Sequence, residues 1–276
     1  MKRRFYIAFF VITLSLTAND NLRLQYDYAN QLFNQEEYFS AITEFKRLQF
    51  FDEEEKYSFL SNLKIGTAYK KGGFYDNAIE YLSKAKHETQ NREEQIEADF
   101  QIIRCNILRG TFQRSLQLLD ELEKEQHTRK VQNKIHYWRG WTYMLWNKWD
   151  SAAVNFEKIS KEHELKQLSE QVNEDKYSVT FARVISYILP GAGQIYTGNY
   201  FSGFMSLTWN VLWGYLTINA FTAERVFDGA AIGSLLWLRF YRGNIQNAEK
   251  LAENENIKIA NKALFYLMEN YKGERP

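Results

Sequence analysis

GTAYKKGGFYDNAIEYLSKA, residues 66–85, contains two small residues at the points where two helices would meet. Gly66 lies in the first predicted helix and Ala78 lies near the start of the second, with a glycine pair between them. Leu82 follows one helical turn after Ala78. Small residues let two antiparallel helices approach closely, and a large residue one turn away fills the groove between them. This stretch therefore predicts a pair of packed antiparallel helices.

The same pattern recurs every 37 residues between residues 22 and 162. The small residues of the second helices are Ala41, Ala78, Ser115 and Ala152, and the large residues after them are Phe45, Leu82, Leu119 and Phe156. The matching positions in the first helices are Ala29, Gly66, Ile103 and Gly140. A fixed period of this length indicates a stack of repeated helix pairs. We therefore predict four repeats with two helices each.

This pattern closely resembles tetratricopeptide repeats, whose usual period is 34 residues. The first, second and fourth units match well, whereas the third carries Ile103 and Asn106 at key points. The resemblance implies an all-α fold, a TPR-like helical solenoid over residues 19–164, with a concave surface lined by the first helix of each pair. By analogy with the family, that groove would hold a protein partner.

Five first-helix residues of the third and fourth repeats are the predicted contacts of this partner. They are Phe100, Arg104, Tyr137, Trp141 and Met144. The fourth repeat is rich in Trp and Tyr, and buried aromatic side chains dominate the energies of protein interfaces. The alternative is that these aromatic side chains pack between repeats or against the last third of the chain.

The last third begins with a long uncharged stretch: residues 184–223 contain no Asp, Glu, Lys or Arg. The run over residues 201–222 is long enough for a transmembrane helix, which needs about 20 residues. A second, shorter apolar run covers residues 229–241. We therefore expect a small helical membrane hairpin domain over residues 177–243, joined to the solenoid by a polar linker, 165–176, with lipid as a second partner.

Ahead of the long run stands the sequence PGAGQIYTG. It resembles the turn of the small two-helix membrane domains of the TM2 type. Six residues of the turn and Gly203 after it carry the likeness; the six are Pro190, Gly191, Gly193, Gln194, Tyr196 and Gly198. Glycines permit a tight backbone reversal, and Gln194 is able to bond backbone groups freed at a helix break. The turn is interpreted as architecture, with a binding or gating element as the alternative. A very hydrophobic but soluble helical hairpin is the other alternative.

The amino terminus predicts an export signal over residues 1–18, with a basic start followed by an apolar run. An uncleaved anchor is the alternative. If the signal is cleaved, the expected location is a bacterial inner membrane with the solenoid in the periplasm. Residues 244–276 have helical apolar spacing, which predicts an amphipathic helix that lies on the membrane or caps the solenoid.

The composition argues against several functional classes. A net charge of +1 provides no basic field for nucleic acid. The sequence contains no metal-binding motif, phosphate loop or nucleophile elbow, so we expect no cofactor, no metal and no enzyme. Cys105 is the one cysteine and is expected in the core. The leading hypothesis is a membrane-anchored scaffold that mediates protein–protein interaction at the bacterial cell envelope. The alternative is a lipid- or small-molecule-handling membrane protein with the solenoid as recruiter.

Overall fold

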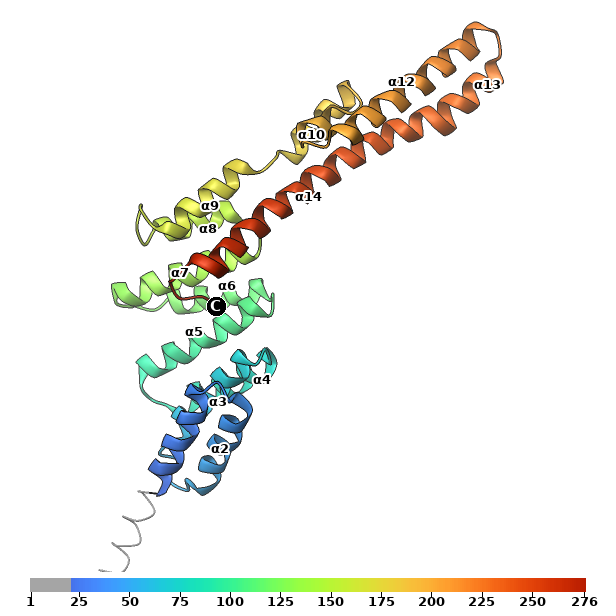
Figure 1. The fold of residues 1–276 in the computed structure, drawn as a ribbon. Coiled ribbons are helices and arrows are strands. Elements are labelled where there is room, and N and C mark those ends of the chain that lie inside the picture. Colours follow the sequence, from blue (N-terminus) through green and yellow to red (C-terminus); the bar gives the residue numbers. More distant parts are fainter. Residues whose placement is uncertain (1–20) are drawn as a thin grey trace, which may run out of the picture. The chain divides into compact units, whose positions relative to one another are not determined.

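The computed structural model describes residues 21–276, which form helices and connecting turns without any strand (Figure 1). This confirms the predicted all-α class for the described residues. The chain divides into two compact units. The first ends at Lys166 and also includes Glu274–Pro276, and the second is Gln167–Gly273. The predicted signal, residues 1–18, lies outside the described residues.

The first unit contains the predicted helix pairs. Its described residues up to 157 form eight helices. Consecutive helices pack against each other, as expected of a helical solenoid, and the first helices α3, α5 and α7 also touch one another in order. The helices are residues 21–34, α2 (Tyr38–Phe51), α3 (Ser58–Lys71), α4 (Tyr75–Glu88), α5 (Arg92–Leu108), α6 (Phe112–Glu123), α7 (Arg129–Leu145) and α8 (Trp149–Glu157).

The repeated residues form the core of this unit. The small residues at the start of the second helices are fully buried, and so are the large residues one turn later: Ala41, Ala78, Ser115 and Ala152, with Phe45, Leu82, Leu119 and Phe156. A Cβ added to Gly66 would lie 2.6 Å from Leu82 Cγ, and one added to Gly140 would lie 2.6 Å from Phe156 Cζ. In the second and fourth repeats, the large residue of the second helix therefore packs directly onto the glycine of the first helix, as the sequence predicts.

The turn inside each helix pair also repeats every 37 residues, with a residue in the left-handed region each time. These are Glu36 (φ 64°), Gly73 (φ 80°), Gly110 (φ 77°) and Asn147 (φ 60°). After each one, the next backbone N–H bonds to the carbonyl five residues before it, as in Phe74 N to Tyr69 O at 2.9 Å. This Schellman-type closure satisfies carbonyls at the end of the first helix and turns the chain into the second.

The second unit holds the rest of the helices, and α9 (Glu164–Asp175) runs across the boundary between the units. The segment predicted as a linker is therefore helical. The unit's other elements are α10 (Val179–Ile188), α11 (Ala192–Tyr196), α12 (Tyr200–Thr222), α13 (Val226–Ala231), a π-helical segment η1 (Ile232–Trp237) and α14 (Leu238–Asn270).

The elements from α13 to α14 form one continuous helix that lies beside α12 (Figure 1). Its last section, α14, packs against α10 and α11. The boundary expected between residues 243 and 244 falls inside α14, because the helix that begins in the second apolar run continues into the amphipathic stretch without a break.

Among the helices of residues 21–276, none combines the length and the apolar content that a membrane span requires. This does not agree with the transmembrane helix predicted over residues 201–222. The helix forms there and has 23 residues. Two asparagines, Asn210 and Asn219, and several Ser and Thr residues interrupt its apolar character.

Candidate functional site

Three first-helix side chains form the polar part of the solenoid face predicted to bind a partner: Lys70 of α3, Arg104 of α5 and Tyr137 of α7. We call these three residues the α3–α7 face. They come together because α3 packs on α5 and α5 packs on α7. The Arg104 side chain is only 12% exposed. Its guanidinium lies 4.7 Å from the ring centre of Trp138, which holds the cation in place by a cation–π contact.

The α3–α7 face holds a short stretch of the same chain, Glu274–Pro276, which belongs to the first unit. Arg104 Nη1 donates to Glu274 Oε1 at 2.5 Å, and Nη2 donates to the backbone carbonyl of Arg275 at 2.6 Å. The Tyr137 hydroxyl donates to the backbone carbonyl of Glu274. Arg104 and Tyr137 thus form hydrogen bonds with one side-chain carboxylate and two consecutive main-chain carbonyls.

The electrostatics of this face favour an anion. Burial and the neighbouring Arg104 charge lower the pKa of Lys70 to about 8, and the Glu274 carboxylate acts in the opposite direction. Lys70 Nζ donates to Gln101 Oε1 at 2.8 Å. Two cations held close together at a partly desolvated site repel each other, so an added carboxylate relieves that repulsion.

The other three predicted contacts are buried, with 1% exposure for Phe100 and Met144 and 3% for Trp141. They therefore offer almost no surface to a partner in this structure, and Arg104 and Tyr137 supply the polar contacts. Cys105 is fully buried, and its pKa is raised by burial to about 11, so the thiol stays protonated at neutral pH.

In the second unit, the six predicted turn residues form a compact reversal between α10 and α12. Gly191 has φ 93°, and a Cβ there would lie 2.2 Å from the carbonyl oxygen of Gly203. No other residue fits this position without moving the backbone. Pro190 precedes it, Gly193 lies in the first turn of α11, and Gly198 (φ 77°) ends the reversal ahead of α12.

Gln194 is fully buried and is the polar centre of this reversal. Its Nε2 donates at 3.0 Å to both the backbone carbonyl and the Oδ1 of Asn244. Tyr196 packs edge-on against Tyr177 and Phe181, and its hydroxyl accepts from Ser178 N at 3.1 Å.

Asn244 of α14 is the residue that sequence reasoning missed. Its Oδ1 also accepts from Gly191 N at 2.8 Å and from Ser206 Oγ at 2.7 Å, and its Nδ2 donates to Ser186 O at 3.1 Å. It thus connects α10, the turn, α12 and α14. The one signal for it is that an asparagine stands on the apolar stripe shared with Ala248.

No family model matches this chain, and no curated protein matches it. The geometry of its own residues therefore supplies the argument for its function.

Proposed function

We propose that this protein is a non-catalytic, TPR-like interaction protein whose α3–α7 face binds an extended, acidic segment of a partner protein. The observation that supports this most directly is the engagement of Glu274 and Arg275 by Arg104 and Tyr137. Hydrogen bonds to consecutive main-chain carbonyls favour a partner segment with an extended backbone. The ion pair with Arg104 favours an acidic side chain in that segment.

We further propose that the second unit attaches the protein to a membrane surface. Residues 184–223 carry no formal charge, and large apolar side chains of the second unit are exposed: Phe201, Phe204, Val211, Leu212, Tyr215, Ile218, Phe221, Phe227 and Leu235. Exposed apolar surface on this scale is typical of membrane or protein contact. Protein binding by the first unit would then take place at that membrane.

The acidic-segment proposal is tested with the blocked peptide Tyr-Lys-Gly-Glu-Arg-Pro, which copies residues 271–276. The peptide is titrated into a chain that ends at Gly273, so that Glu274–Pro276 does not compete for the face, and binding is followed by NMR. The expected result is saturable binding, weakened about tenfold or more by Arg104→Gln, because a charge-assisted bidentate contact is lost. Arg114→Gln is the matched control, since Arg114 is an exposed arginine on the second helix α6 of the same repeat. Equal binding by the three proteins would refute the proposal.

A peptide with Gln in place of Glu separates the contribution of the carboxylate charge from that of the main-chain hydrogen bonds. The proposal expects this peptide to bind more weakly, with Tyr137→Phe weakening both peptides to a similar extent. If the Glu and Gln peptides bind equally well, the acidic preference is wrong even though the face binds peptides.

A further inference from the structure

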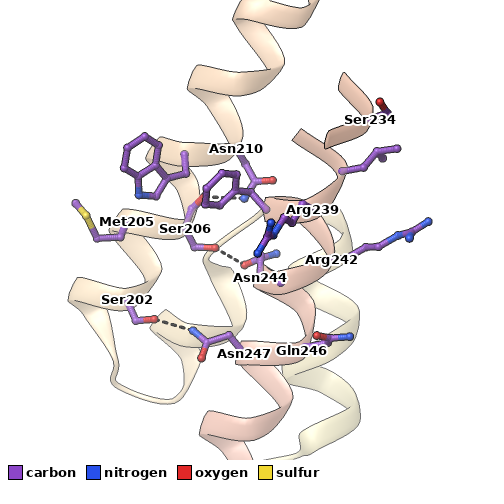
Figure 2. Close-up of a pocket in the computed structure, with 14 residues that line it drawn as sticks. Ser202, Met205, Ser206, Asn210, Ser234, Arg239, Arg242, Asn244, Gln246 and Asn247 are labelled. Carbon is purple, nitrogen blue, oxygen red and sulfur yellow. Dashed lines mark hydrogen bonds between the residues drawn. The ribbon is translucent and has the colours of Figure 1, made fainter. Parts of the chain in front are cut away.

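A pocket of about 710 Å³ opens between α12 and α14 in the second unit. Ser202, Ser206 and Asn210 line it from α12, and Arg239, Asn244 and Asn247 line it from α14 (Figure 2). Two of its wall contacts are hydrogen bonds that join the helices, Ser206 Oγ to Asn244 Oδ1 at 2.7 Å and Asn247 Nδ2 to Ser202 Oγ at 2.9 Å. The pocket therefore has a polar floor held by side chains of both helices.

Asn210 has a polar atom that this network leaves unused. The residue is 5% exposed, and its Nδ2 donates to Ser206 O at 2.8 Å, within its own helix. Its Oδ1 is buried and has no hydrogen-bond partner among the described residues. A buried acceptor without a hydrogen-bond partner destabilises the folded state, because it has lost its bond to water. This atom would gain from a ligand that donates a hydrogen bond.

The pocket is also cationic. Arg239 and Arg242 line it, no acidic residue does, and neither arginine forms an ion pair within residues 21–276. Figure 2 shows the side chains of Asn210 and Arg239 pointing toward one another from the two helices, while Arg242 points outward. An anion that also carries a hydroxyl donor is the ligand class that matches this pair.

The remaining wall is aromatic and apolar. The rings of Trp209 and Phe240 stack with centres 5.7 Å apart, and Trp213 stacks on both. From here the exposed apolar side chains of α12 and η1 continue toward the turn at Glu224, with no charged residue on α12. Indole rings beside arginines, at the edge of a long apolar surface, are the arrangement that favours a lipid–water boundary.

We propose that the α12–α14 pocket binds the headgroup of an anionic glycerophospholipid. Arg239 contacts the phosphate, a headgroup hydroxyl donates to Asn210 Oδ1, and the acyl chains lie along the exposed apolar side chains of α12. This inference rests on the proposed membrane attachment and adds a headgroup specificity to it. A soluble phosphate ester shares the headgroup chemistry, so the experiment separates the two sources.

The test uses the full chain and co-sedimentation with vesicles of phosphatidylcholine, with and without added phosphatidylglycerol or phosphatidic acid. The expected result is binding at least about tenfold tighter to phosphatidylglycerol vesicles than to phosphatidylcholine alone. Arg239→Gln removes that preference, whereas Arg225→Gln, an exposed arginine at the hairpin tip, retains it. Equal weakening by both variants indicates non-specific charge attraction and overturns the proposal.

Asn210→Leu tests the hydroxyl contact, and it should weaken binding to phosphatidylglycerol while leaving phosphatidic acid, which lacks the headgroup hydroxyl, unchanged. Thermal melting shows whether Asn210→Leu is folded. If it is not, the comparison of Arg239→Gln with Arg225→Gln still tests the headgroup site, because Arg239 is exposed. Glycerol 3-phosphate and inorganic phosphate serve as soluble probes, and competition by either at the lipid's own concentration would overturn the lipid assignment. Binding of all vesicles alike would support membrane attachment and refute the headgroup site.

Discussion

At the scale of single residues, the protonation of Lys70 links the stability of the protein to the proposed binding face. Lys70 is 7% exposed and lies beside Arg104. Burial and the neighbouring charge lower its pKa to about 8 from an ordinary value of 10.5. In the unfolded chain Lys70 keeps its proton up to the ordinary value. Between these two pH values the unfolded state therefore binds more protons than the folded state, and the free energy of unfolding rises with pH.

We predict that Lys70→Met abolishes this rise. For the native protein, the contribution of Lys70 to the free energy of unfolding increases from pH 8 to pH 10.5 by at most about 3 kcal/mol. Urea denaturation at pH 7, 8, 9 and 10 measures it, with the exposed neighbour Lys71→Met as the control. Parallel pH profiles for native protein and Lys70→Met would show that Lys70 titrates normally.

Residue positions in the repeat were predictable, whereas their partners were not. The register of the repeat places Arg104 and Tyr137 on first helices, and both do bond a chain segment. That the segment is Glu274–Pro276 has no local signal, because it depends on a contact across more than a hundred residues. Asn244 was also missed because its partners are distant in sequence: they lie in α10, in the turn and in α12, 38 to 58 residues away.

At the scale of elements, the turn inside each helix pair is the most regular feature of the first unit. The same hydrogen bonds close all four turns, yet only two of them have glycine at the left-handed position. Glu36 occupies this position in the first turn and Asn147 in the fourth. A side chain in the left-handed region costs roughly 1–2 kcal/mol, less for asparagine.

We predict that Gly73→Ala lowers the free energy of unfolding by about 1 kcal/mol, and that Glu36→Gly raises it by a similar amount. A Cβ at Gly73 meets no atom within 4 Å, so the expected loss is conformational rather than steric. Gly243→Ala is the matched control, because its Cβ also meets open space but its backbone is helical. Urea denaturation should rank Gly243→Ala above Gly73→Ala in stability; the reverse order would contradict the role of the turn.

Periodicity predicted the helices of both units but not the character of the last ones. The break at Pro190 and the start of α12 follow from proline and glycine chemistry, and the structure has both. The absence of charge over residues 184–223 favoured a membrane span, but absence of charge is a weaker condition than high hydropathy. The asparagines of α12 carry no charge but lower the hydropathy of the helix. One of them, Asn210, lines the α12–α14 pocket.

At the scale of the whole molecule, the chain combines a repeat unit that carries the proposed binding face with a helical unit that has an exposed apolar surface. The proposed binding face is already occupied by Glu274–Pro276. A partner segment must therefore compete with a segment of the same chain, whose effective concentration is high because it is tethered. Weakening the internal contact should then strengthen the binding of an added peptide.

The most direct test of this account is the dissociation constant of the blocked peptide Tyr-Lys-Gly-Glu-Arg-Pro for the full chain and for its Glu274→Gln variant. We predict about tenfold tighter binding to the variant, because one charge-assisted contact of the internal competitor is lost while Arg104 and Tyr137 remain. Glu269→Gln, an exposed change in α14, should leave the constant unchanged. An unchanged or weaker affinity for the Glu274→Gln variant would contradict the claim that this face binds acidic segments.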